Sequence, residues 1–312
     1  MTRYLVTGGA GFIGSHLSRA LVEAGHDVVV LDNLSTGKLA NIDDLQDRLR
    51  FVEGSITDLA TVQDCCDGVD CVFHQAALPS VPRSVADPLT SDEQNIGGTL
   101  RVFWGAHLSG VRRVVYAASS SIYGDTEELP KHEGMQPRPM SPYAVNKRVS
   151  ELYGSVFNNL YGLSTIGLRY FNVFGARQDP ESQYAAVVPK FITAFLNGQA
   201  PVIHGDGLQS RDFTFIQNVV EANLAAAAAT NEAGGRSYNV ALGGRITVKD
   251  LCLRIRELLG SDIDPVYDAS RPGDVKHSQA DISLARKYLD YQGSVDLDSG
   301  LKQTVDWYRE QI

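Results

Sequence analysis

The sequence has few of the residues that build disulfide frameworks, metal sites and membrane spans. Its 312 residues include four cysteines, Cys65, Cys66, Cys71 and Cys252, and no His or Cys pair at zinc-ligand spacing accompanies them. The alanine run at 225–229 is too short to cross a bilayer. We therefore expect buried thiols in a reducing compartment, and neither a metal site nor contact with a membrane.

Positive charge is also scarce. The sequence carries 28 Lys and Arg against 37 Asp and Glu, a formal net charge of −9 at pH 7, which disfavours nucleic acid as a partner. An anionic substrate would need arginines placed locally at its site. The Gly-x-Ser-x-Gly and His-Glu-x-x-His motifs of hydrolases are absent. Because a predicted strand begins almost at once, we expect no signal peptide and a cytoplasmic location.

The first pattern that is present is a glycine-rich turn between a predicted strand and a predicted helix. Apolar residues 4–6 precede the turn, and residues 15–22 follow it as the helix. The glycines fit two registers, Gly9-x-Gly11-x-x-Gly14 and Gly8-x-x-Gly11-x-x-Gly14, and the sequence does not choose between them. A turn of this kind lets backbone N–H groups at a helix N-terminus approach a diphosphate.

An acid at the end of the second predicted strand indicates which dinucleotide the turn binds. The strand Asp27–Asp32 ends on a carboxylate about twenty residues after the glycines, where it can accept hydrogen bonds from an adenosine ribose. Asp32 would repel a 2′-phosphate, and no arginine follows it closely. The pattern therefore favours NAD over NADP.

Strand and helix patterns alternate through the first half of the chain. Further strands are predicted at 49–53, 70–74 and 113–118, and helices at 87–109 and 141–161. Alternation at this spacing predicts an α/β fold with a Rossmann-like, doubly wound parallel sheet. Asp58 can either cap the helix that follows it or hydrogen-bond an adenine amino group, and both interpretations stay open.

The second half predicts a smaller α/β C-terminal lobe that binds the substrate. Helices are expected at 183–197, 217–229, 248–259 and 298–310, with a strand at 201–203. We expect residues 1–168 plus about 212–242 to form the NAD-binding Rossmann domain. Residues from about 169–211 plus 243–312 would form the smaller lobe, which the family resemblance described below implies to be nucleotide-sugar-binding.

A tyrosine and a lysine on the predicted helix 141–161 indicate acid–base chemistry. Tyr143 and Lys147 are four residues apart, so their side chains project from one face. An unperturbed tyrosine, with a pKa of about 10, is a poor base at neutral pH, and a neighbouring ammonium lowers that pKa. Ser119, Ser120 and Ser121 follow the strand 113–118, at the edge where open α/β sheets bind ligands. A hydroxyl there can bridge a substrate oxygen and the phenol.

Together these motifs resemble the extended short-chain dehydrogenase/reductase family, and in particular its nucleotide-sugar epimerases. The resemblance covers nearly the whole chain. Its more specific segments are Ser141-Pro142-Tyr143, Arg169–Gly175 and Arg271–Asp274, which are similar to UDP-hexose 4-epimerases.

The resemblance implies a role for each site residue. Tyr143 would remove the proton of the sugar 4-hydroxyl while hydride passes from C4 to NAD⁺, and hydride would return to the other face of the 4-keto sugar. Ser119 would hydrogen-bond the 4-oxygen, and Lys147 would hold the nicotinamide ribose. The expected cofactor-binding residues are Gly8, Gly11, Phe12, Ile13, Gly14, Asp32, Asn33, Ile56, Asp58, Gln75, Ala76, Ala77, Tyr143, Lys147 and Tyr170.

The resemblance also implies a UDP-sugar site. The expected substrate residues are Ser80, Arg83, Ser119, Ser120, Tyr143, Asn172, Val187, Val188, Arg211, Arg271, Asp274 and Ser278. Arginines 211 and 271 would bind the diphosphate, although Arg211 fits a surface salt bridge nearly as well. In the family, the position of Ser278 acts as a gate, and a small residue there admits N-acetyl groups. UDP-GlcNAc/UDP-GalNAc is therefore the expected pair, with UDP-Glc/UDP-Gal as a second activity.

Several alternatives remain open. An epimerase restricted to UDP-glucose, a nucleotide-sugar 4-ketoreductase and a non-catalytic NAD sensor would share most of these motifs. A dehydratase is disfavoured because Ser120 and Ser121 stand where dehydratases carry an Asp-Glu pair. The apolar faces of the helices around 99–109 and 141–161, with the resemblance, predict a homodimer.

Overall fold

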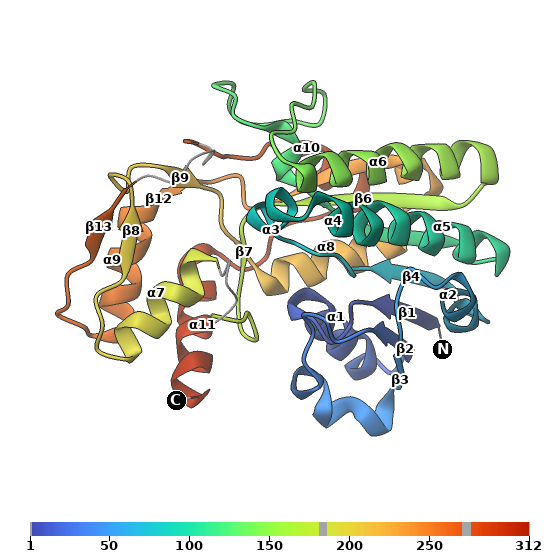
Figure 1. The fold of residues 1–312 in the computed structure, drawn as a ribbon, viewed down its shortest axis with the longest axis horizontal. Coiled ribbons are helices and arrows are strands. Elements are labelled where there is room, and N and C mark those ends of the chain that lie inside the picture. The colour runs from blue at the N-terminus through green and yellow to red at the C-terminus, as the bar shows by residue number, and fades with distance from the viewer. Residues whose placement is uncertain (1, 181–185, 270–275, 312) are drawn as a thin grey trace.

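The computed structural model describes residues 2–180, 186–269 and 276–311. Within these residues a seven-stranded parallel sheet has the order β11-β6-β5-β4-β1-β2-β3 (Figure 1). The strands are β1 Arg3–Thr7, β2 Asp27–Asp32, β3 Arg50–Glu53, β4 Cys71–His74, β5 Arg113–Ser119, β6 Ser164–Tyr170 and β11 Arg236–Val240. The predicted fold class, a Rossmann-like doubly wound sheet, is confirmed.

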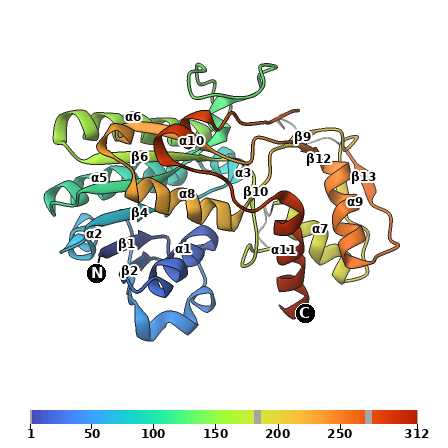
Figure 2. The ribbon, with the colours of Figure 1, turned by 180° about the vertical axis from the view of Figure 1, so that it is seen from behind.

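Helices cover both faces of this sheet (Figures 1 and 2). Helices α1 (Phe12–Glu23) and α8 (Ile216–Ala228) pack together on one face, while α2 (Leu59–Cys66), α5 (Gly98–Leu108) and α6 (Pro142–Tyr161) lie on the other. The central strands are apolar on both sides, so that alternate residues feed two separate cores.

The strand order reverses between β1 and β4, and this reversal creates the place for a ligand. Both neighbours of β1 are parallel to it, but the chain runs outward through β2 and β3 before it crosses back to β4. The loop that follows β1 and the loop that follows β4 therefore turn away from each other at the carboxyl ends of these two strands. A crevice opens there.

The predicted helix 87–109 is interrupted by a π-helical segment. The structure has α3 (Val81–Ala86), α4 (Pro88–Asp92), a π turn at Glu93–Gly97 and then α5. The π turn directs Asn95 inward, where its side chain accepts a hydrogen bond from Leu78 N at 2.8 Å and donates one to Leu78 O at 3.3 Å. The interruption thus fixes the loop that follows β4.

The C-terminal lobe lies beside the carboxyl edge of the sheet (Figure 1). Its elements are α7 Val187–Leu196, α9 Val248–Leu259 and α11 Leu297–Gln311, with the strand pairs β7 Val173–Phe174 and β10 Thr214–Phe215, β8 Val202–His204 and β13 Val266–Asp268, and β9 Ser210–Arg211 and β12 Ile246–Thr247. Helix α10, Ser283–Leu289, packs instead against β11 and α8 of the main sheet. The division into two domains at the residues given above stays a prediction. No helix in the described ranges is long and apolar enough to span a bilayer.

Candidate active site

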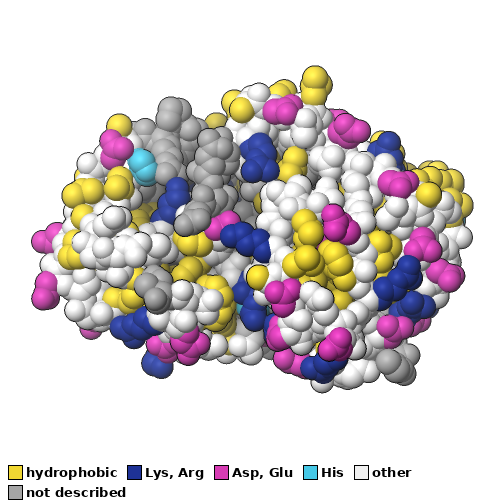
Figure 3. All heavy atoms as spheres, turned by 60° about the horizontal axis from the view of Figure 1, so that its bottom comes forward, with side chains coloured by type: hydrophobic (Ala, Val, Ile, Leu, Met, Phe, Trp, Pro, Cys, Tyr) yellow, Lys and Arg dark blue, Asp and Glu magenta, His cyan; other side chains and the backbone are white. Residues whose placement is uncertain are grey.

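A cavity of about 1420 Å³ lies along the carboxyl edge of the sheet and continues to the C-terminal lobe. Most of its floor comes from the glycine turn, the loops after β2 and β4, and the end of β5. In Figure 3 lysine and arginine side chains, in dark blue, lie along the furrow between the two halves of the molecule. Local positive charge is therefore present at this seam of a net-negative protein.

The glycine turn closes tightly on itself. Gly8 has φ +70°, and a Cβ added to it would lie 2.6 Å from Ala76 N. A Cβ on Gly14 would lie 2.0 Å from Gly8 O. Gly8, Gly11 and Gly14 line the cavity, whereas Gly9 packs against Val30 in the core. The structure therefore places the register Gly8-x-x-Gly11-x-x-Gly14 at the cavity.

Asp32 is held at the cavity wall by backbone donors. Its Oδ2 accepts a hydrogen bond from Ala10 N at 2.9 Å, and its Oδ1 accepts one from Leu34 N at 2.9 Å. Burial raises the pKa of the carboxyl, and the two N–H donors oppose that rise. A Cβ on Gly37 would lie 2.9 Å from both carboxyl oxygens, so the following loop passes directly over the acid.

Asp58 acts as a helix cap in this structure. It is the N-cap of α2, and its carboxylate accepts hydrogen bonds from Ala60 N at 3.1 Å and Thr61 Oγ1 at 2.6 Å. Its side chain is not part of the cavity lining, unlike that of Ile56 on the same loop. The contact with adenine stays a prediction.

The cavity fits a dinucleotide. The glycine cradle leaves no room for side chains where a diphosphate would approach α1, Asp32 can accept from a ribose, and the small residues Ala76 and Ala77 line the path toward β5. The predicted cofactor residues all line this cavity except Asp58.

Ser119, Tyr143 and Lys147 come together at the end of this path. Ser119, Tyr143 and Lys147 all line the cavity, and the side chain of Ser119 acts to lower the pKa of the Tyr143 phenol. Lys147 Nζ donates to Ala117 O at 2.7 Å and lies 5.8 Å from the centre of the Tyr143 ring. Ser119 is the last residue of β5, and the other two residues come from the first turns of α6. The arrangement can bind a substrate oxygen and exchange a proton with it.

Burial controls the protonation of this group. It raises the pKa of Tyr143, against the hydrogen bond with Ser119, and it lowers the pKa of Lys147 to about 8. The lowered pKa that the sequence suggested for Tyr143 is therefore wrong for the protein alone. The physical reason is that burial in a low-dielectric wall disfavours the charged form of each group.

Capping contacts set the position of α6. Its N-cap, Ser141, accepts a hydrogen bond from Ala144 N at 3.2 Å, and Tyr143 N donates to Ser84 Oγ at 3.1 Å. Farther along the helix, Glu151 forms a buried ion pair with Arg169 of β6 at 2.6 Å. Both ends of the helical segment that carries the tyrosine are therefore fixed to neighbouring elements.

The predicted substrate residues divide into three sets. Besides the catalytic ones, those that line the cavity are Ser80, Arg83, Ser120 and Asn172. Four residues lie outside the cavity lining: Val187, the buried Val188, Arg211 and Ser278. The guanidinium of Arg211 donates hydrogen bonds to Ser210 O and Lys276 O. Ser278 is 7% exposed, and its backbone N–H donates to Ser210 O. Arg271 and Asp274 lie outside the described residues.

Other cavity residues escaped the sequence analysis. Lys38 lies at one rim, Arg177 and Asp179 follow β7, and Trp307 and Tyr308 come from α11. No motif or spacing joins these positions, because packing of the lobe against the sheet brings them together. Arg177 carries a weak local signal, since it lies two residues after the segment Arg169–Gly175.

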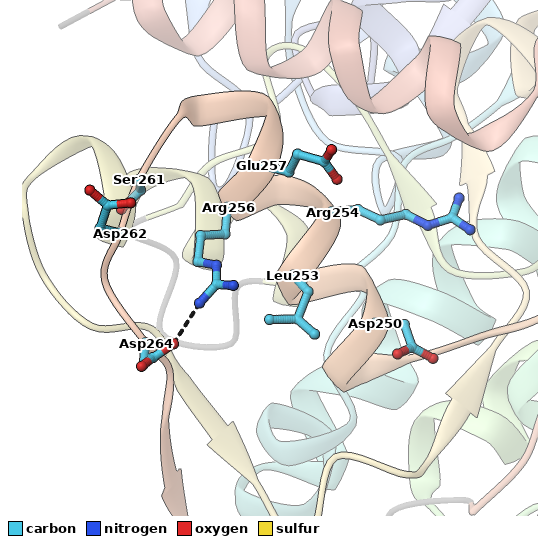
Figure 4. Close-up of a pocket in the computed structure, with 8 residues that line it drawn as sticks. All are labelled: Asp250, Leu253, Arg254, Arg256, Glu257, Ser261, Asp262 and Asp264. Carbon is cyan, nitrogen blue, oxygen red and sulfur yellow. Dashed lines mark hydrogen bonds and ion pairs between the residues drawn. The ribbon is translucent and has the colours of Figure 1, made fainter.

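A second hollow lies on α9 and the loop after it (Figure 4). Its walls are mostly charged, and Arg256 is paired with Asp264 at 2.5 Å. It shares no residue with the cavity at the glycine turn. The four cysteines are buried and free, and the described residues contain no group of three or more His, Cys, Asp or Glu that could hold a metal.

The fold and the site define a dinucleotide-dependent enzyme of the extended short-chain dehydrogenase/reductase type. The sequence model of the NAD dependent epimerase/dehydratase family matches residues 4–241, and the chain belongs to this family. NAD, the cofactor expected from Asp32, is thereby confirmed.

Similarity to individual proteins extends over the whole chain. A solved UDP-N-acetylglucosamine 4-epimerase from Methanobrevibacter ruminantium M1, in complex with UDP-N-acetylmuramic acid, is 42% identical with a TM-score of 0.93 over 100% of this chain and 99% of that chain. A UDP-glucose 4-epimerase from Thermotoga maritima, solved with UDP-glucose, is 37% identical with a TM-score of 0.94 and 99% coverage of both. UDP-glucose 4-epimerase of Mycolicibacterium smegmatis is 38% identical over 313 residues, 99% of each chain.

The close contact at Gly14 predicts that alanine there disturbs cofactor binding. We expect Gly14→Ala to weaken NAD⁺ binding at least tenfold, about 1.4 kcal/mol, because the turn must open to admit the methyl group. Isothermal titration after removal of bound nucleotide measures this. Gly244→Ala, where an added Cβ meets nothing within 4 Å, is the matched control. Unchanged affinity in Gly14→Ala at an unchanged melting temperature would contradict the cradle.

Proposed function

We propose that the protein interconverts the 4-epimers of a UDP-sugar through a transient 4-keto sugar, with NAD retained at the site. The observation that carries the proposal is that Ser119, Tyr143 and Lys147 line the same cavity as the glycine turn, with Lys147 Nζ 5.8 Å from the centre of the Tyr143 ring. Similarity over the whole chain to proteins described as UDP-sugar 4-epimerases supports it.

The side chains have distinct roles in this reaction. Tyr143 takes the proton of the sugar 4-hydroxyl, and Ser119 hydrogen-bonds the same oxygen. When bound, NAD supplies a hydride acceptor and donor, so that C4 can be oxidised and reduced in place. Lys147, with a pKa of about 8, is mostly an ammonium at neutral pH and stabilises the phenolate of Tyr143. After the keto sugar turns over, Tyr143 returns the proton to the 4-oxygen.

We further propose that UDP-GlcNAc and UDP-GalNAc are the preferred pair, and that UDP-Glc and UDP-Gal are also substrates. Ser278 is small, and its backbone is paired with β9 beside Arg211. Arg211, together with Arg271 and Asp274, would bind the UDP moiety. The 42% identical relative is described as a UDP-N-acetylglucosamine 4-epimerase, whereas two other relatives are described as UDP-glucose 4-epimerases.

The direct test is incubation of the purified protein with UDP-GlcNAc, and separately with UDP-Glc, without added NAD. We expect the 4-epimer to appear by NMR with both sugars, and faster with UDP-GlcNAc. Tyr143→Phe, which removes the hydroxyl, should lower kcat by at least a hundredfold. Turnover that requires stoichiometric NADH would instead indicate a ketoreductase, and cofactor binding without turnover would indicate an NAD sensor.

The gate at position 278 gives a separate prediction. Ser278→Tyr places a large ring where we expect the N-acetyl group, so UDP-GlcNAc turnover should fall at least tenfold while UDP-Glc turnover stays within about twofold. Ser278→Ala is the matched control, because it removes the hydroxyl without adding bulk. Equal losses for the two sugars would contradict the assignment of the gate.

We also propose a cytoplasmic homodimer. Apolar side chains of α6 face solvent in the single chain, with Val145, Leu152, Val156 and Leu160 exposed by 44, 50, 43 and 75%, and Leu108 of α5 by 49%. A contiguous apolar patch of this kind is typical of an interaction surface. A second copy of the same helices would bury it symmetrically.

Leu152→Asp with Val156→Asp should convert the dimer to a monomer, because two carboxylates would have to be buried in the interface. Light scattering at micromolar concentration measures the mass. Leu208→Asp, which alters a side chain 55% exposed on a loop of the C-terminal lobe, should leave the mass unchanged. A monomeric wild-type protein at that concentration would exclude the proposal.

A further inference from the structure

We propose that residues 176–180, here called the clasp segment, hold the two lobes closed over the dinucleotide cavity and thereby set the rate at which NAD leaves. The inference rests on the NAD dependence of the family and on no assumption about the sugar. The clasp segment directly follows β7, and four of its residues, 177–180, line the cavity. Arg177 adopts φ +63°, a left-handed conformation that is costly for a residue other than glycine.

The first contact joins the clasp segment to the helix behind the glycine turn. His16 of α1 hydrogen-bonds Ala176 O through Nε2 at 2.8 Å, so Nε2 is the donor. Burial lowers the pKa of His16 to about 4, and the imidazole is therefore neutral at physiological pH. The hydrogen bond is accordingly a constant tie between α1 and the clasp segment across the neutral range.

The second contact joins the clasp segment to the loop that follows Asp32. Lys38 Nζ lies 3.0 Å from Asp179 Oδ2, and both residues line the cavity. The backbone of Lys38 is itself fixed, because its N–H donates to Ala10 O at 3.0 Å. The ion pair therefore joins the loop after β2 to the clasp segment at the cavity wall.

The third contact comes from the lobe. Tyr308 of α11 donates its hydroxyl hydrogen to Gln178 O, and Gln178 Nε2 donates to Val173 O at 3.1 Å. The side chain of Gln178 is thus tied back to β7, while its Oε1 is buried without a partner in the described structure. The clasp segment is consequently anchored from α1, from the loop after β2 and from α11.

These three anchors explain why the segment should govern release. Asp32, the glycine turn, Lys147 and residues 177–180 all line one cavity, so a dinucleotide that reached from Asp32 to Lys147 would share that cavity with the clasp segment. Because exposed ion pairs contribute little individually, the expected effect of losing Lys38–Asp179 is about threefold. Loss of the buried His16 bond should have a larger effect, about tenfold.

The test measures cofactor release directly. Protein loaded with NADH is mixed with excess NAD⁺, and the release rate is followed by NADH fluorescence in a stopped-flow instrument. We expect Lys38→Ala and Asp179→Ala each to accelerate NADH release about threefold. The double variant should release NADH no faster than either single variant. The charge exchange Lys38→Asp with Asp179→Lys should return the rate to within twofold of wild type. Lys302→Ala, which breaks a comparable exposed ion pair with Asp306, is the matched control.

His16 variants separate the bond from general packing. His16→Phe removes the donor and should accelerate release about tenfold, whereas His16→Gln retains a donor and should release within about threefold of wild type. Wild-type release rates in every clasp variant, at unchanged melting temperature, would overturn the proposal. If the effects of Lys38→Ala and Asp179→Ala on the release rate were fully additive, the two side chains would act independently, and the ion pair would have no part in retaining NAD. Because no sugar is present, these outcomes are independent of the epimerase proposal.

Discussion

The structure depends on how closely the first helix can approach the first strand. Gly14 lies where a Cβ would come within 2.0 Å of Gly8 O, and a Cβ on Gly8 would come within 2.6 Å of Ala76 N in the loop after β4. This contact brings the N-terminus of α1 to the edge of the sheet, next to Asp32. A positive helix terminus, a ribose acceptor and the crevice between β1 and β4 therefore converge on one strip of surface. Every other functional element is positioned relative to that strip.

Chemistry is supplied at the other end of the cavity, by groups whose pKa values are shifted by burial. Tyr143 and Lys147 are held on α6, whose first turn is capped and whose middle is pinned by the Glu151–Arg169 ion pair. Burial moves the pKa of the phenol up and that of the ammonium down, so that Lys147 gives up its proton more readily than Tyr143 does. The fold thus places Tyr143, which can exchange a proton, in the same cavity as the hydroxyl of Ser119 and the glycine turn. Residues of the C-terminal lobe complete the lining of that cavity.

Sequence reasoning succeeded where a property depends on neighbours along the chain. The strand ending at Asp32, the helix begun by Ser141 and the convergence of Tyr143 with Lys147 all follow from local spacing and capping. It failed where tertiary packing decides. The edge strand β11, Arg236–Val240, mixes polar and apolar residues and gave no clear pattern, and the cavity contact of Lys38 exists only because the lobe folds over the sheet. The direction of the pKa shift of Tyr143 needed burial, which no motif encodes.

The central claim is that the protein oxidises and re-reduces one sugar carbon without exchanging its cofactor. The most direct measurement uses UDP-sugar deuterated at C4, incubated in ordinary water with protein to which no NAD is added. The account predicts that the 4-epimer forms with the deuterium still on C4, because the hydride leaves and returns within the closed site. Replacement of that deuterium by solvent hydrogen, or epimerisation that depends on added NAD in stoichiometric amount, would contradict it.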